Sequence, residues 1–88
     1  MKTFDDLKFV DVVVLYNPGI RSRMMFENGY GVSVVSTQMS YGGKQGLYEV
    51  AVLNSDGEIT YDTPITDDVV GWLSKDGVTD IMTQVQNL

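Results

Sequence analysis

Residues 47–65, LYEVAVLNSDGEITYDTPI, contain the strongest local folding signal in the chain. The run 47–53 is rich in β-branched and aromatic residues, and the run 58–62 alternates polar and apolar residues. An Asp56-Gly57 step separates the two runs, and Asp-Gly in this position is typical of a tight β-hairpin turn. The sequence therefore predicts two antiparallel strands here, with the rest of the chain pairing with them or covering them.

A second hairpin is predicted from residues 20–37, where two alternating runs flank an Asn-Gly step. A two-residue loop would set charged side chains opposite core positions, because one step of register turns a whole strand face over. A three-residue loop at 27–29, with Gly29 left-handed in a G1 bulge, instead places Met24 opposite Val32. The hydrophobic pattern favours the three-residue loop.

The N-terminal segment is expected to add one more strand. Residues 9–16 form a β-branched run, and the Asn-Pro-Gly sequence at 17–19 favours a turn that ends it. Before this strand, Thr3 can cap a short helical turn at 4–7, with two acidic residues where a helix N-terminus favours them.

The last quarter of the chain is expected to be helical. Thr66 is placed as an N-cap before Asp67 and Asp68, and apolar residues follow at 69–73. The chain restarts at 74–77, and apolar side chains then recur at helical spacing. This stripe consists of Val78, Ile81, Met82, Val85 and Leu88.

Strands first and helices last are typical of the α+β class. We expect a four- to five-stranded antiparallel meander sheet, with a C-terminal helix or helix pair packed on one face. A chain of 88 residues has the size of one domain, so residues 1–88 are expected to form a single α+β domain. A domain this small buries enough surface for one core but has little excess stability, which favours stabilisation by a partner subunit.

The composition excludes several kinds of chemistry. The chain contains no cysteine and no histidine, so disulfides, thiolate metal sites and the commonest general base are all excluded. We find no spacing that ties a nucleophile to a base, and we expect no enzymatic activity and no cofactor. The longest apolar run, at 12–16, is far below the roughly 20 residues that span a bilayer. Because the N-terminus lacks the pattern of a signal peptide, a cytoplasmic protein is expected.

Charge is divided unevenly along the chain. Residues 1–44 carry four acidic and five basic side chains, whereas residues 45–88 carry eight acidic side chains and one lysine. An acidic half repels nucleic acid and anionic membranes and attracts basic proteins. A protein with a basic surface is therefore the expected partner, and open strand edges favour a homodimer as an alternative.

Two groups of residues are candidates for contact with such a partner. The glycine-rich loop 38–46 and the acidic side chains of the second half supply them, because binding residues concentrate on loops and exposed charges. These candidates are Tyr41, Lys44, Asp62, Asp67, Asp68, Asp76 and Asp80. The loop also has a purely connecting interpretation. Asp62, Asp67 and Asp68 could bind Mg²⁺ or Ca²⁺ through oxygen atoms, although Asp67 and Asp68 are better explained as first-turn helix acids.

Three stretches carry a resemblance to a known group of proteins. FENGYGVSVV at 26–35, GLYEVAVL at 46–53 and ITYDTPITDDVVGWLS at 59–74 resemble small uncharacterised proteins encoded by tailed bacteriophages. The resemblance covers about half of the chain and contains no catalytic motif. It implies a phage product in the cytoplasm of an infected bacterium, and it implies no site residues.

Three functional hypotheses follow. The first is a non-enzymatic protein that binds another macromolecule, for example an inhibitor whose carboxylates occupy the basic cleft of a host nucleic-acid-binding enzyme. The second is a structural or accessory phage protein that acts as a homo-oligomer. The third is a carboxylate-based binder of a metal or small ligand.

Overall fold

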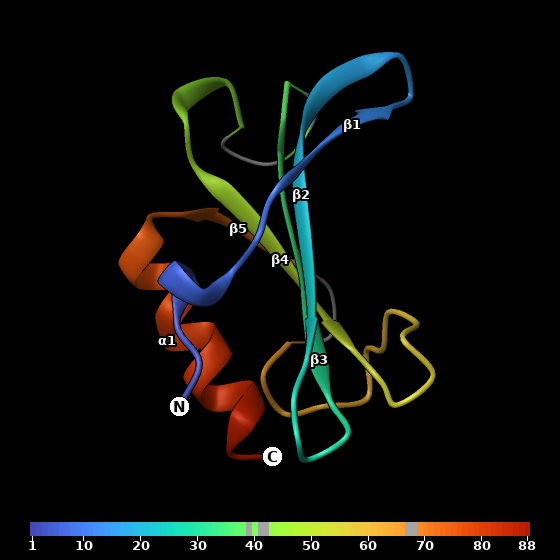
Figure 1. Ribbon diagram of the computed structural model, residues 1–88, viewed down its shortest axis with the longest axis vertical. Helices are drawn as coiled ribbons and strands as arrows, with labels where there is room; N and C mark the ends of the chain where they lie inside the picture. The colour runs from blue at the N-terminus through green and yellow to red at the C-terminus, as the bar shows by residue number, and fades with distance from the viewer. Residues whose placement is uncertain (39, 41–42, 67–68) are drawn as a thin grey trace.

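The computed structural model describes residues 1–38, 40, 43–66 and 69–88 and confirms the predicted α+β class (Figure 1). One antiparallel sheet has the strand order β1-β2-β3-β4-β5, so each strand pairs with its neighbour in sequence. The strands are β1 (Val10–Val14), β2 (Asn17–Met25), β3 (Gly31–Thr37), β4 (Tyr48–Leu53) and β5 (Val70–Leu73). The helices are the 3-10 turns η1 (Phe4–Asp6) and η2 (Gly43–Gln45) and the C-terminal α-helix α1 (Lys75–Gln86).

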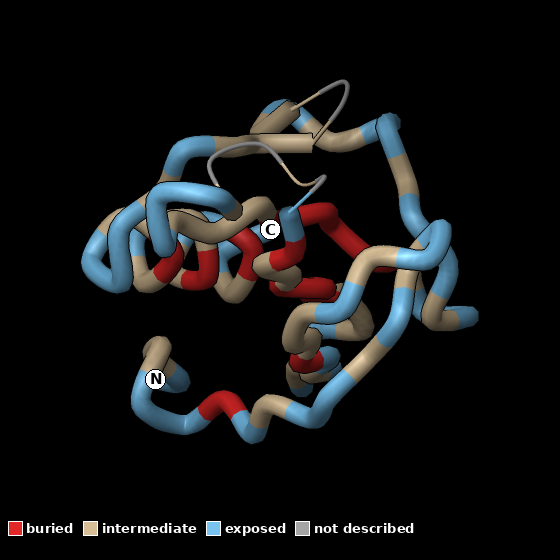
Figure 2. Tube along the Cα trace, turned by 90° about the horizontal axis from the view of Figure 1, so that it is seen from above, coloured by how far each residue is buried: buried red, intermediate tan, exposed pale blue. Residues whose placement is uncertain are grey.

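The helix α1 lies across one face of the sheet and closes the main core. Its stripe residues Val78, Met82 and Val85 are fully buried, as predicted. They meet the alternate residues of β3 and β4 that point to the same face, and the buried positions gather toward the centre of the molecule in Figure 2. These sheet residues are Val32, Val34, Val50 and Val52. Leu88 lies beyond the last turn of α1 and is partly exposed, so it extends the stripe only in sequence.

Ser74 starts the helix by accepting a hydrogen bond from the backbone N–H of Gly77 at 3.2 Å. This side-chain cap satisfies one of the backbone donors that the first turn leaves without an intrahelical partner. The predicted restart of the chain at 74–77 is therefore the start of α1.

The N-terminal segment packs along α1. The backbone N–H of Phe4 donates to Thr79 Oγ1 at 3.0 Å, and the ring of Phe4 lies 5.1 Å from that of Tyr48 between centroids. Leu7 follows η1 and is buried in the main core. The predicted turn at 4–7 is thus confirmed as a 3-10 turn that joins the helix to the sheet.

The hairpin between β2 and β3 has the predicted three-residue loop. Met24 pairs with Val32, the N–H of Phe26 donates to the carbonyl of Tyr30 at 2.7 Å, and Gly29 has φ +87°. This arrangement turns Met24 toward the core and leaves the arginines of β2 on the opposite face.

The predicted turn at residues 17–19 is wrong. Asn17, Pro18 and Gly19 do not form a turn, because they are the first residues of β2. Pro18 is tolerated there because it lies outside the ladder with β3, which begins at Gly19, so its missing N–H is not needed. The chain instead reverses at Leu15 and Tyr16.

The predicted strand at 58–62 is reduced to one bridge between Leu53 and Ile59, with the Thr60 N–H donating to the Val52 carbonyl at 2.9 Å. The other half of the β4 edge is occupied by β5, which the sequence assigned to a helix at 69–73. β-Branched residues and Gly71 disfavour a helix in this segment. Pairing with β4 sets Val70 opposite Val50 and lets Leu73 pack against the core. Residues 67 and 68 lie outside the described part of the chain.

We predict that replacing Met82 with alanine lowers the free energy of unfolding by about 2–5 kcal/mol, because it leaves a cavity under α1. Leu88→Ala, at the exposed end of the same stripe, is the matched control and should cost well under about 1 kcal/mol. Urea denaturation of both variants measures the difference. Equal losses would contradict the assignment of the core.

Candidate functional site

The β1–β2 hairpin presents large apolar side chains to solvent. Val10 and Val13 are 60% and 72% exposed, and Leu15 and Tyr16 at the turn are 79% and 98% exposed. The tip of this hairpin stands at the upper end of the molecule in Figure 1, far from α1. Val10 and Val13 point to opposite faces of the sheet, because side chains alternate along a strand, so the hairpin is apolar on both sides. Exposed apolar side chains grouped on one element of a small domain are typical of an interaction surface.

The two residues of the hairpin turn, Leu15 and Tyr16, have exposed side chains and an unfavourable left-handed backbone conformation. Leu15 and Tyr16 have φ values of +50° and +67°, which match the type I′ turn preferred by two-residue hairpin loops. Such turns favour Asn-Gly, because other residues lose about 1–2 kcal/mol each in the left-handed region. Asn17 supports the turn by donating from Nδ2 to the Leu15 carbonyl at 2.8 Å. Two strained residues that contribute no packing inside the domain point to a role outside it.

The outer edge of β1 is free to pair with another strand. Among the described residues, only β2 pairs with β1, so one row of backbone donors and acceptors faces solvent. The opposite edge is less suited to pairing, because β5 has only four residues and its ladder with β4 contains a register shift. Trp72 in β5 has a positive φ of +61°, which distorts that edge further.

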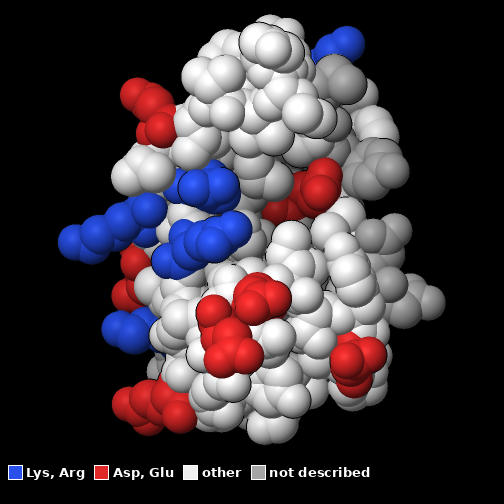
Figure 3. Space-filling view, turned by 90° about the vertical axis from the view of Figure 1, so that its right-hand side faces the viewer, with Lys and Arg blue, Asp and Glu red and all other residues white. Residues whose placement is uncertain are grey.

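Basic side chains accompany the hairpin on the sheet face opposite α1. Arg21 and Arg23 alternate with the core-facing residues of β2, and Arg21 pairs across the ladder with Val10. Figure 3 looks at this face and shows most of its basic side chains gathered at mid-height, with acidic side chains beside and below them and a largely uncharged surface above. Basic and acidic side chains therefore lie close to one another on this face.

Those predicted partner-binding residues that lie in the described part of the chain do not share one surface. Lys44 lies in η2, in the segment at the upper end of Figure 1, whereas the segment that carries Asp62 lies at the lower end. Asp76 and Asp80 are exposed and stand one turn apart on α1, on the side away from its buried stripe. The other three candidates, Tyr41, Asp67 and Asp68, lie outside the described residues.

The sequence does not predict the tip of the β1–β2 hairpin, because Leu15-Tyr16 is not a typical turn sequence whereas the Asn-Pro-Gly that follows it is. The sequence therefore predicts that the strand continues through Leu15 and Tyr16. The continuous apolar run at 12–16 gives no signal of this turn, because such a run is typical of a buried strand.

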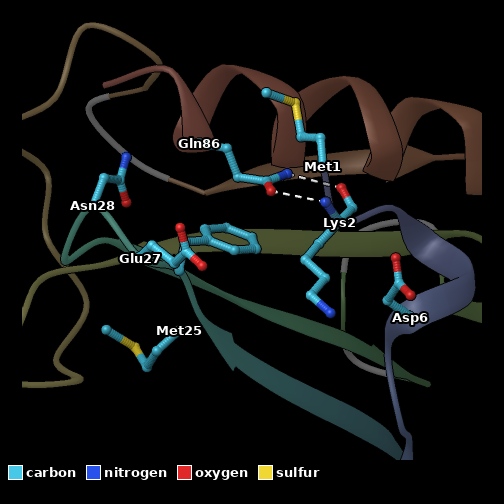
Figure 4. Close-up of a pocket in the computed structure, with 8 residues that line it drawn as sticks. Met1, Lys2, Asp6, Met25, Glu27, Asn28 and Gln86 are labelled. Carbon is cyan, nitrogen blue, oxygen red and sulfur yellow. Dashed lines mark hydrogen bonds between the residues drawn. The ribbon is translucent and has the colours of Figure 1, made fainter.

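A second feature is a cleft of about 620 Å³ between the N-terminal segment, the end of α1 and the β2–β3 hairpin (Figure 4). The Gln86 side chain accepts from the Lys2 N–H and donates to the Lys2 carbonyl, both at 2.8 Å. Asn28 donates from Nδ2 to the Val85 carbonyl at 2.8 Å. These two amides are therefore engaged in joining the N-terminal segment, the end of α1 and the β2–β3 hairpin, and the charged residues that line the cleft are Lys2, Asp6 and Glu27.

Within the described ranges, no cluster of three or more acidic residues is placed to hold a metal ion. Asp67 and Asp68, on which the metal hypothesis depended together with Asp62, are not among those residues. None of the helices in the same ranges combines the length and the apolar character that crossing a bilayer requires.

Comparison with protein families, with curated proteins and with solved structures finds no match for this chain.

We predict that Leu15→Asn combined with Tyr16→Gly raises the free energy of unfolding by about 1 kcal/mol or more, because Asn-Gly relieves the strain of the turn. Thermal denaturation followed by circular dichroism measures the effect. Asn17→Ala, which removes the hydrogen bond to Leu15, should act in the opposite direction. A destabilised Asn-Gly variant would show that the exposed side chains support the fold.

Proposed function

We propose that this protein is a non-enzymatic binding protein that acts by contacting another macromolecule. The observation that carries the proposal is the β1–β2 hairpin, which combines four exposed apolar side chains, a strained turn and a free strand edge. Each feature costs stability or solubility in an isolated domain, and each is useful at an interface. We place this activity in the cytoplasm, consistent with a chain that contains no cysteine.

Charge supports a basic protein as the partner. The net charge is −6, and Asp76 and Asp80 project from the outer side of α1. Asp5 and Asp6 add two exposed carboxylates on η1, which packs against the same helix. Complementary charge accelerates association with a basic surface, and added salt weakens this association by screening the charges. An inhibitor that occupies the basic cleft of a nucleic-acid-binding enzyme is the sharpest form of this proposal.

The second candidate function is that of a homo-oligomeric accessory protein. The specific observation that favours it is the free outer edge of β1, since exposed edges with few charges pair readily with other strands. β1 contains one charged residue, Asp11, in five.

The basic-partner proposal predicts that an immobilised chain captures a protein from bacterial lysate at low salt and releases it at high salt. The double variant Asp76→Asn/Asp80→Asn should lose most of the capture. Asp56→Asn/Glu58→Gln, at the turn after β4, removes the same charge elsewhere and should retain it. If both double variants lose capture to the same extent, net charge rather than the α1 surface determines binding. If nothing is retained by the wild type at low salt, the proposed basic partner is wrong.

A further inference from the structure

We propose that the partner of the β1 edge is a second copy of this chain, paired antiparallel about Val12 so that the two sheets become continuous. The inference rests on the proposed function of the β1–β2 hairpin as a contact surface. It assigns the occupant of that surface and the register of the contact.

The hairpin geometry fixes which backbone groups are available. In a two-residue hairpin the residues that flank the loop exchange hydrogen bonds, and these residues are Val14 and Asn17. Because the hydrogen-bonding pattern alternates along the strand, Val12 also bonds to β2. The N–H and C=O groups of Asp11 and Val13 point away from β2, in the plane of the sheet. A new strand must bond to Asp11 and Val13.

Only some strand registers let these N–H and C=O groups form hydrogen bonds without bringing like charges together. Pairing about Val12 places Asp11 of each copy opposite Val13 of the other, so all four outward-pointing groups of each β1 meet groups that also point outward. Pairing about Asp11 would set two carboxylates directly opposite each other, which destabilises a strand pair. The Val12 register also places Val10 opposite Val14, so apolar side chains line one face of the joint.

The composition of the edge favours a copy of the same chain as its occupant. β1 is nearly symmetric about Val12, with valine at four of its five positions and a single charge one residue from the centre. A two-fold contact of this kind is the commonest form of self-association. The alternative edge, β5, is short and distorted by a register shift, so it suits neither a copy of itself nor β1.

The proposed homodimer contact and the basic-partner contact are expected to depend on salt in opposite ways. Each copy carries a net charge of −6, so the copies repel one another at long range. Screening weakens that repulsion, and the proposed homodimer therefore strengthens as salt rises, whereas binding to a basic protein weakens.

Cysteine crosslinking tests the register directly, because the chain has no cysteine of its own. In the proposed dimer the two Val12 residues form a non-hydrogen-bonded pair with Cα atoms about 4.5 Å apart, inside the disulfide range of about 4.4–6.8 Å. The two Val13 residues are offset and lie about 8 Å apart, too far for a disulfide. Val13 is the more exposed of the two, so random collisions would favour the control.

In glutathione buffer at equal protein concentration, Val12→Cys should form a disulfide-linked dimer at least about tenfold faster than Val13→Cys. Equal rates, a faster Val13→Cys reaction or no crosslinking by either variant would overturn the proposal.

A charge pair at position 13 supplies a second test that does not depend on disulfide chemistry. Val13→Lys places a cation opposite Asp11 of the second copy, and Val13→Asp places an anion there, at a position exposed enough to accept either. Sedimentation should show the dimer of Val13→Asp to be about tenfold weaker than that of Val13→Lys, since two symmetric cross-strand pairs change sign. Indistinguishable association would exclude this register.

The two levels of the proposal fail separately. If the cysteine and charge tests fail while Leu15→Asn/Tyr16→Gly abolishes capture from lysate, the hairpin is a contact surface for a different protein and the homodimer is wrong. If the hairpin variant changes neither capture nor association, the proposed contact surface itself is wrong.

Discussion

The burial of the α1 stripe against β3 and β4 is the contact on which the rest of this structure depends. Val78, Met82 and Val85 close the core over the centre of the sheet, and the N-terminal segment is then held against the outer flank of the helix. One helix of twelve residues covers only part of a five-stranded sheet. Because the helix is placed over the central strands, the β1–β2 hairpin extends beyond it without cover.

That placement explains why the two edges of the sheet differ. β5 runs directly into α1 through Ser74, so its position is set by the helix, and it is short and irregular. β1 is joined to the body through β2 and keeps a regular ladder up to its turn. The regular edge is also the one with exposed valines and a strained apolar turn. Stability of the isolated domain does not account for this combination, whereas a contact at the β1 edge does.

The sequence predicted those parts of the fold in which local preference and burial agree. The α1 stripe and the bulged loop with Gly29 each had a single register that buried the apolar side chains, and both are present. The failures lie where two local signals competed. Asn-Pro-Gly at 17–19 is a stronger turn sequence than Leu15-Tyr16, yet hairpin twist and the support of Asn17 placed the turn earlier.

The β4 edge shows the same competition at longer range. Residues 58–62 follow the Asp-Gly turn and alternate like a strand, but β5 pairs with the first half of β4 and leaves them one bridge. Pairing between segments that are distant in sequence cannot be read from either segment alone. The candidate surface also depends on which strands pair. The sequence shows where the acidic residues are, but it does not show which strand edge is left unpaired.

The central claim, that the outer edge of β1 is a contact surface, is tested most directly by amide hydrogen exchange at Asp11 and Val13. In a lone chain these two N–H groups face solvent, whereas in the paired state they are hydrogen-bonded. The account predicts that their exchange slows as protein concentration rises, while the exchange of Val12, already bonded to β2, changes far less. Exchange at Asp11 and Val13 that stays fast at every concentration, and remains fast in bacterial lysate, would contradict it.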